Sequence, residues 1–152
     1  MTPEQLQQLL QELPPFADEA PPSPFLREFC RYYGIDFVAQ HPDLDYVAGT
    51  VRSGGYALAV HCLQRPGASS NLLLLHGYFD HHGLFGKLIE WGLSSNCNVI
   101  IFELTGHGLS SGEAAVIDKI GDYSHDIANV LATERLPEVP MWVMGQSTGC
   151  AA

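Results

Sequence analysis

The stretch that decides the fold is Met141-Trp142-Val143-Met144-Gly145-Gln146-Ser147-Thr148-Gly149, followed by Cys150-Ala151-Ala152. Its apolar residues predict a buried strand, Gly-x-Ser-x-Gly predicts a tight turn, and the small residues after it predict the start of a helix. A serine in such a turn lies in a strained backbone conformation that raises its hydroxyl above the sheet edge. Gly145 and Gly149 have no side chains to collide with the neighbouring strand and helix. Ser147 is therefore a candidate nucleophile, and the first amides of the next helix are directed at any negative charge that develops beside it.

The chain upstream of this turn alternates strands with helices. Apolar runs at 46–51 and 56–63 flank Ser53-Gly54-Gly55, which predicts a β-hairpin. Continuous apolar runs then alternate with amphipathic patterns, which predicts a parallel sheet with helices on both faces and ligands at the carboxyl ends of its strands. The runs are strands at 71–75, 99–102 and 141–144, helices at 84–93 and 120–131, and loops at 76–83, 103–112 and 145–149 that are expected to meet at one edge.

The first forty residues lack the alternation of strands and helices that the rest of the sequence shows. Two short helices, with a proline-rich extended connector at 16–24 between them, are expected over 1–40. They could form a lid or a docking arm, but packing against the edge of the sheet is the default expectation. Residues 41–152 are expected to form the α/β unit, ending just after the Ser147 turn.

Composition limits the possible functions. The 152 residues suit one domain, and the net charge of −10 argues against nucleic acid or an anionic membrane as the main partner. No apolar stretch is long enough for a transmembrane segment, and the first residues lack the basic start and apolar core of a secretion signal. The four cysteines are scattered without metal-site spacing, so we expect reduced thiols, no zinc site and a cytoplasmic location.

Three motifs in register carry a resemblance to a known family. Leu72-Leu73-Leu74-Leu75-His76-Gly77, Glu103-Leu104-Thr105-Gly106-His107-Gly108-Leu109-Ser110 and Gly145-Gln146-Ser147-Thr148-Gly149 resemble successive landmarks of the α/β-hydrolase fold. Their character is similar to monoacylglycerol lipases and lysophospholipases. The resemblance covers about residues 45–152 and implies an N-terminal antiparallel hairpin leading into a mostly parallel sheet.

The resemblance also implies roles for individual residues. Ser147 would attack an acyl carbon, and the backbone N–H groups of Tyr78 and Thr148 would form the oxyanion hole. His76 and Gly77 would support the loop that carries Tyr78. Relatives usually have proline where Thr105 stands, so the 103–112 loop is expected to be less rigid here.

One departure from the family pattern is large. The acid and the histidine of the catalytic triad follow later strands in this fold, and the sequence stops five residues after Ser147. The implied protein is an esterase or lipase acting on a small-molecule or lipid ester without a cofactor, of which this chain is an inactive N-terminal part that needs the missing C-terminal half. His81, His82 and His107 lie on loops near the active edge, but we do not expect them to replace the missing base because each would need its own orienting partner.

Two other classes of function remain open. His76, Asp80 and His81 nearly match the zinc loop of metallo-β-lactamase-like hydrolases, but Tyr78 stands where an imidazole ligand is required. The chain could also be a non-enzymatic remnant or a binding module on a hydrolase scaffold, because fold does not determine function. The sequence does not name the substrate.

Overall fold

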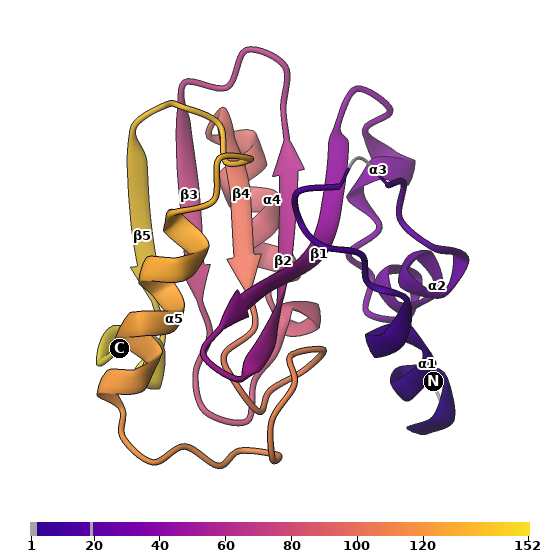
Figure 1. Cartoon of the computed structure of the whole chain (residues 1–152). Coiled ribbons are helices and arrows are strands. Elements are labelled where there is room, and N and C mark those ends of the chain that lie inside the picture. The colour runs from indigo at the N-terminus through magenta and orange to yellow at the C-terminus, as the bar shows by residue number, and fades with distance from the viewer. Residues whose placement is uncertain (1–2, 19) are drawn as a thin grey trace.

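The structure is a computed structural model, which describes residues 3–18 and 20–152. Five strands form one sheet in the order β1-β2-β4-β3-β5 (Figure 1). β1 and β4 both pair antiparallel with β2, whereas β3 pairs in parallel with both β4 and β5. The predicted class, an antiparallel hairpin leading into a parallel sheet, is therefore confirmed. The strands are β1 (Asp45–Ser53), β2 (Tyr56–Gln64), β3 (Ser70–Leu75), β4 (Cys97–Phe102) and β5 (Met141–Gly145).

Helices cover both faces of the sheet, as expected. α4 (Gly86–Ser94) lies behind it and α5 (Gly121–Leu131) in front (Figure 1). Successive residues of β4 point to opposite faces, so Val99 and Ile101 pack in the cluster that holds Ile89 of α4. Ile100 packs in the other cluster, with Tyr123 of α5. This two-sided burial explains why the β4 sequence is a continuous apolar run.

Three helices precede the sheet: α1 (Pro3–Glu12), α2 (Pro24–Tyr32) and α3 (Phe37–Gln40). The Ser23 hydroxyl caps α2 by accepting a hydrogen bond from the Leu26 N–H at 3.2 Å. Gly34 follows α2 in the left-handed region, at φ 69°, as a helix C-terminus favours. The four-residue helix α3 has no side-chain cap and was not predicted from the sequence.

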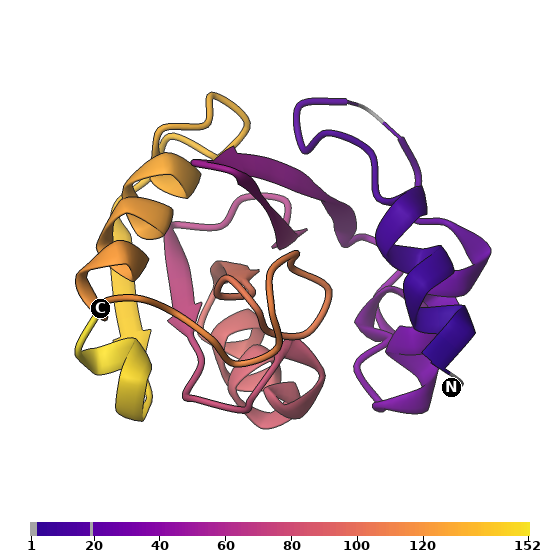
Figure 2. The same ribbon diagram turned by 60° about the horizontal axis from the view of Figure 1, so that its bottom comes forward.

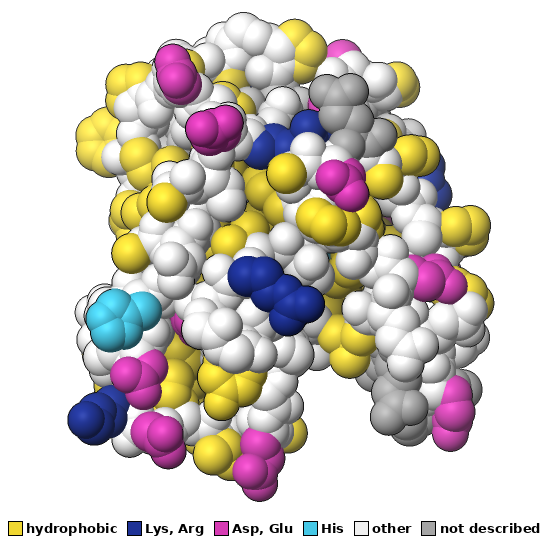
Figure 3. Space-filling view, viewed as in Figure 1, with side chains coloured by type: hydrophobic (Ala, Val, Ile, Leu, Met, Phe, Trp, Pro, Cys, Tyr) yellow, Lys and Arg dark blue, Asp and Glu magenta, His cyan; other side chains and the backbone are white. Residues whose placement is uncertain are grey.

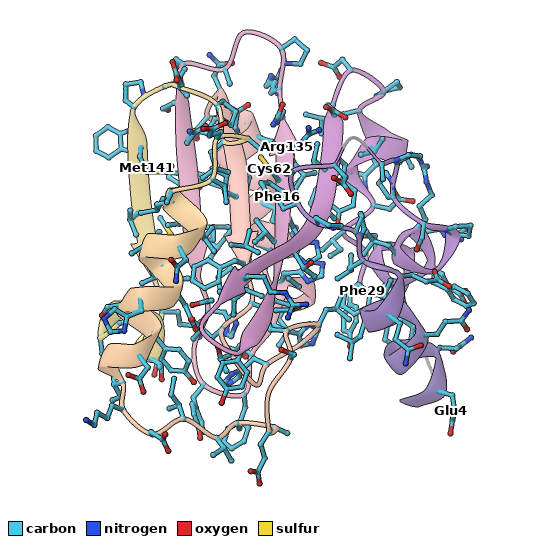
Figure 4. The ribbon with its side chains drawn as sticks, in the orientation of Figure 1. Glu4, Phe16, Phe29, Cys62, Arg135 and Met141 are labelled. Carbon is cyan, nitrogen blue, oxygen red and sulfur yellow. The ribbon has the colours of Figure 1, made fainter. Side chains whose placement is uncertain are left out.

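The segment after α1 covers the free edge of β1. Thr50 donates its N–H to the Pro14 carbonyl at 2.7 Å and accepts from the Phe16 N–H at 2.9 Å. A Cβ on Gly49 would lie 2.6 Å from the Phe16 Cα, so the close approach requires glycine there. Phe16 is buried against the front of the sheet (Figure 4). The connector after α1 thus packs against the sheet edge and protects it from pairing with other chains.

The parallel strands β3, β4 and β5 all end at the bottom of Figure 1, and Figure 2 shows the loops that follow them from below. β4 and β5 lie on opposite sides of β3, so the chain reverses its winding direction at β3. In open α/β sheets, ligands bind outside the carboxyl ends of the strands at such a reversal. The topology therefore places the candidate site at the end of β3.

β5 exposes part of its apolar run, as expected for a strand that has only one partner in this chain. Trp142 is 66% and Val143 59% exposed. The reason is position, because β5 pairs with β3 alone and forms the edge of the sheet. Hydrophobic side chains gather along this edge in the space-filling view (Figure 3). In the described part of the chain, none of the helices has the length and apolar character that crossing a membrane requires.

Candidate functional site

The turn after β5 is sharp, and its serine has a strained backbone. Ser147 is exposed and has a φ of 50°, a conformation that non-glycine residues rarely adopt and that functional sites retain. A Cβ on Gly145 would lie 2.4 Å from the Gly149 carbonyl oxygen, and one on Gly149 would lie 2.4 Å from the Leu75 oxygen. Both positions therefore require glycine. The expected α-helix after the turn is instead a single 3-10 turn over Ser147–Cys150.

The loop after β3 passes directly beside this serine. A Cβ built on Gly77 would lie 3.4 Å from the Ser147 Cβ and 3.4 Å from the Gln146 carbonyl oxygen. The parallel pairing of Leu75 with Gly145 brings the two loops out of the sheet side by side. The sequence-predicted Gly77 and Ser147, seventy positions apart, are thus neighbours in space.

His76 fixes the beginning of this loop with both of its ring nitrogens. Nε2 accepts the Leu104 N–H at 3.0 Å, so the ring proton is on Nδ1, which donates to the Gly77 carbonyl at 2.7 Å. This arrangement requires a neutral imidazole, and burial lowers the pKa of His76 below its ordinary value. His76 therefore acts as a structural brace between the ends of β3 and β4.

Two backbone donors remain available near the serine. The Gly77 carbonyl is held by His76 and by the Asp80 N–H at 3.2 Å. The peptide bonds are trans, so the Tyr78 N–H points away from that carbonyl. Among residues 3–18 and 20–152, no hydrogen bond involves the N–H of Tyr78 or that of Thr148. Both sequence-predicted donors are thus free to bind an anion.

A buried carboxylate, which the sequence did not single out, fixes the end of the same loop. Glu103 accepts from the His82 backbone N–H at 3.1 Å and the His82 Nδ1 at 2.9 Å, and its other oxygen accepts the Leu109 N–H. Burial by itself would raise the pKa of Glu103, but the charge and hydrogen bond of His82 lower it to about 2. A Cβ on Gly108 would lie 2.1 Å from this carboxylate. The sequence signal that could have identified Glu103 is its position directly after the fully buried strand β4.

Thr105 has a partner that proline could not provide. Its hydroxyl donates to the buried Asp126 of α5 at 2.8 Å, and the other Asp126 oxygen accepts from Ser53 at 2.5 Å. The expectation of a less rigid loop rested only on the missing proline ring. The hydroxyl ties the 103–112 loop to both α5 and the β-hairpin, which offsets that loss.

The other histidines considered from the sequence are not hydrogen-bonded to Ser147. Within the described residues, no hydrogen bond joins the Ser147 hydroxyl to an imidazole; Nδ1 of His81 accepts the Gly83 N–H, and Nδ1 of His107 lies 2.9 Å from the Thr105 carbonyl. His107 is buried beside the ring of Tyr78, with centroids 5.2 Å apart. The structure therefore brings Ser147 close to the loop that carries the Tyr78 N–H, and no imidazole in the described part of the chain is hydrogen-bonded to Ser147.

The alternative zinc site at His76, Asp80 and His81 is not formed. Both nitrogens of His76 already face backbone partners, so neither is available to a metal. In the described part of the chain, one group of three potential ligands does come together, and it consists of His61, His82 and Glu103. That group is buried beneath the loop and lies apart from the predicted metal residues.

Comparisons with known proteins identify the family of the chain. The profile of the Hydrolase_4 family, described as serine aminopeptidase S33, matches residues 67–152, which is more than half of the chain. A monoglyceride lipase homolog of monkeypox virus is 32% identical over 80 residues, covering 51% of this chain and 29% of the viral protein. A phospholipase of Bacillus subtilis is 26% identical over 78 residues, covering 51% of this chain and 30% of its own length. The chain thus spans about a third of the curated relatives it matches.

Solved structures show the same fold at lower identity. An esterase of Pyrococcus furiosus superposes with a TM-score of 0.58 at 23% identity, over 70% of this chain and 43% of the esterase. A thioesterase domain from the curacin biosynthetic pathway gives a TM-score of 0.57 at 21% identity, over 69% of this chain and 38% of that domain. Because the family profile matches more than half of the chain and the solved structures share its fold, the chain belongs to the Hydrolase_4 family (serine aminopeptidase, S33) and has the α/β-hydrolase fold.

Proposed function

We propose that this chain supplies the nucleophile and oxyanion hole of a serine hydrolase acting on carboxylic esters. The observation that carries the proposal is Ser147, held at φ 50° beside Gly77, with the N–H groups of Tyr78 and Thr148 unpaired. The lipase and phospholipase among the relatives favour an ester, with a small-molecule or lipid alcohol as leaving group.

The reaction would proceed in two steps. Ser147 Oγ forms a bond to the carbonyl carbon while its proton passes to a general base, and the carbonyl oxygen becomes an oxyanion between the two amides. The alcohol then leaves with a proton, and water releases the acid from the acyl-enzyme by the same route. Each amide donor in such a site contributes a factor of about 100 to 1000 in rate.

Among the described residues, no side chain is placed as a general base on Ser147. The ring nitrogens of His76 are occupied, and neither His81 nor His107 is bonded to Ser147. We therefore propose that residues 1–152 alone are inactive and that a further part of the protein supplies the base and its orienting acid. A non-enzymatic remnant on the same scaffold is the rival, and it predicts no reaction at Ser147 in any form of the protein.

The test uses the complete reading frame that contains this sequence. A fluorophosphonate probe should label it at Ser147, and Ser147→Ala should reduce turnover of a short p-nitrophenyl ester by at least about 1000-fold. Ser94→Ala, on the exposed side of α4, is the matched control and should leave turnover unchanged. Turnover that survives Ser147→Ala would refute the proposed nucleophile, and a complete protein that neither labels nor turns over ester would support the inert scaffold.

The chain of 152 residues is tested separately. It should show no ester turnover above the uncatalysed rate. Turnover by this chain that Ser147→Ala abolishes would show that a base is already present, and would overturn the inactivity proposal.

A further inference from the structure

The loop that carries Tyr78 is fixed at both ends to two successive residues. At its start, His76 Nε2 accepts the N–H of Leu104, and at its end, His82 is bonded twice to Glu103. We call residues 76–82 the oxyanion loop. The two residues that hold this loop, Glu103 and Leu104, are adjacent in the chain and follow β4. The position of the Tyr78 N–H therefore depends on how firmly His82 is held.

His82 is held by rings as well as by Glu103. Its ring stacks on that of Phe29 from α2, with centroids 4.9 Å apart and planes at 17°. It also stacks on His61 of β2, at 3.6 Å and 20°. All three side chains are at most 2% exposed. Phe29 lies between α2 and the sheet (Figure 4), so α2 reaches the oxyanion loop directly.

A second aromatic residue of this region packs against the same stretch of the loop. The ring of Tyr33, which follows the last residue of α2, lies edge-on to His81, with centroids 4.7 Å apart. A Cβ on Gly83 would lie 2.7 Å from the Tyr33 ring, so the glycine permits this contact. The rings of Phe29 and Tyr33 are themselves 4.7 Å apart and form one surface under residues 81–83.

The same helix also reaches the histidine pair from the other side. Tyr46 hydroxyl lies 2.8 Å from His61 Nδ1, and the Cys30 thiol of α2 lies 3.8 Å from that hydroxyl. A ring of contacts therefore runs from α2 through Tyr46, His61 and His82 and back to α2 through Phe29. The cavity beside these residues has a volume of about 10 Å³, so it can hold at most one water molecule.

A metal ion is a poor explanation of this cluster. The rings of His61 and His82 are nearly parallel, so their in-plane lone pairs run side by side and do not converge on one ion. Both Glu103 oxygens already accept N–H groups. The cluster is better suited to holding the loop.

We propose that Phe29 and Tyr33 are positioning residues that hold the oxyanion loop through His81 and His82, so that the α2 region belongs to the catalytic scaffold. This inference rests on the proposed function for its consequence in catalysis, but the mechanical support exists whether or not the protein is active. It gives a role to residues that precede the stretch matched by the family profile, 67–152.

The first test measures amide hydrogen exchange of residues 77–83 in the chain of 152 residues. Phe29→Leu removes the stacked ring while keeping an apolar side chain, and it should speed exchange in the loop by about tenfold or more. Phe16→Leu is the matched control, because Phe16 is equally buried but lies in the cluster on the opposite face. Equal loop exchange in the two variants would overturn the proposal.

Tyr33→Leu provides a second route if Phe29→Leu does not fold. Tyr33 is only partly buried, so its loss should leave the core intact and still speed exchange at residues 81–83. Unchanged exchange there in a folded Tyr33→Leu chain would refute the proposal.

The catalytic consequence is tested in the complete protein. Phe29→Leu should lower kcat for the p-nitrophenyl ester by about tenfold or more with little change in KM, because a displaced donor weakens binding of the oxyanion and not of the ground-state ester. A change confined to KM would contradict the positioning role. If the wild-type protein showed no turnover, only the proposed function would be refuted. The hydrogen-exchange measurement tests independently whether Phe29 and Tyr33 hold the loop.

Discussion

Replacing Gly108 by alanine should destabilise the protein far more than the same change at Gly54. Both glycines have nearly the same left-handed backbone, with φ of 53° and 55°. Alanine in that conformation costs about 1–2 kcal/mol at either position. Around Gly54 there is no atom within 4 Å of an added Cβ, whereas at Gly108 that Cβ would lie 2.1 Å from the Glu103 carboxylate. The difference between the two variants therefore isolates the clash with Glu103.

The expected size of this difference follows from what holds Glu103. The carboxylate is fully buried and accepts hydrogen bonds from His82 and Leu109, so it cannot swing aside into solvent. Displacing it leaves a buried charge without its partners, which costs about 3–5 kcal/mol. With a urea dependence of about 2 kcal/mol per molar, the midpoint of Gly108→Ala should lie about 1.5–2.5 M below that of Gly54→Ala.

Pulse proteolysis in urea at low protein concentration is the appropriate assay, because the exposed β5 edge favours association at higher concentration. A Gly108→Ala chain with no protected fraction, beside a folded Gly54→Ala chain, would correspond to the upper end of the prediction. Midpoints that agree within about 0.3 M would refute the reasoning, because the carboxylate would then have moved at no cost.

Three further predictions concern acid, thiols and the sheet edge. Burial lowers the pKa of His61 and His76 below the ordinary 6.5, so the unfolded chain takes up protons before the folded chain does. The urea midpoint should therefore decrease when the pH is lowered from 7.5 to 5.5, and an unchanged midpoint would contradict this. Cys150 is exposed and should react with Ellman's reagent in the native protein, whereas the other three cysteines, all buried, should react only on unfolding; rapid reaction of all four thiols would be the contrary result. Trp142→Lys should reduce light scattering from associated protein, and Tyr32→Lys, at the same 66% exposure on α2, should not; equal effects would exclude the β5 edge as the site of association.

The fold was predictable to the extent that its signals are local. The apolar run before His76 and the Gly-x-Ser-x-Gly turn at Ser147 each define a strand end within a few residues, and the structure places both as expected. The exposure of Trp142 could not be read from the local apolar run, and was expected only through the family resemblance, because it depends on β5 lying at the edge of the sheet. Helix α3 was missed since four residues without a capping side chain leave almost no periodic pattern.

The support of the site was hidden from the sequence for a different reason. Glu103 and His82 are 21 positions apart, and each alone resembles an ordinary polar residue beside a glycine-rich loop. Phe29 lies still further away, in a helix that looked like simple packing. Their relation exists only after β3 and β4 pair and bring the two loops together. Sequence patterns locate the candidate site residues here, and tertiary contacts determine what holds them.

The attachment of the oxyanion loop to Leu104 and Glu103 makes residues 76–82 a closed ring of chain, joined at one place by non-covalent bonds. Because both ends of the loop are attached, additional residues can be accommodated only in the part of the loop that faces solvent. That outward part holds Phe79, which is 77% exposed. Under the proposed function, insertions beside Phe79 would change the part of the loop that faces solvent while leaving both attachment points, and the Tyr78 amide between them, in place.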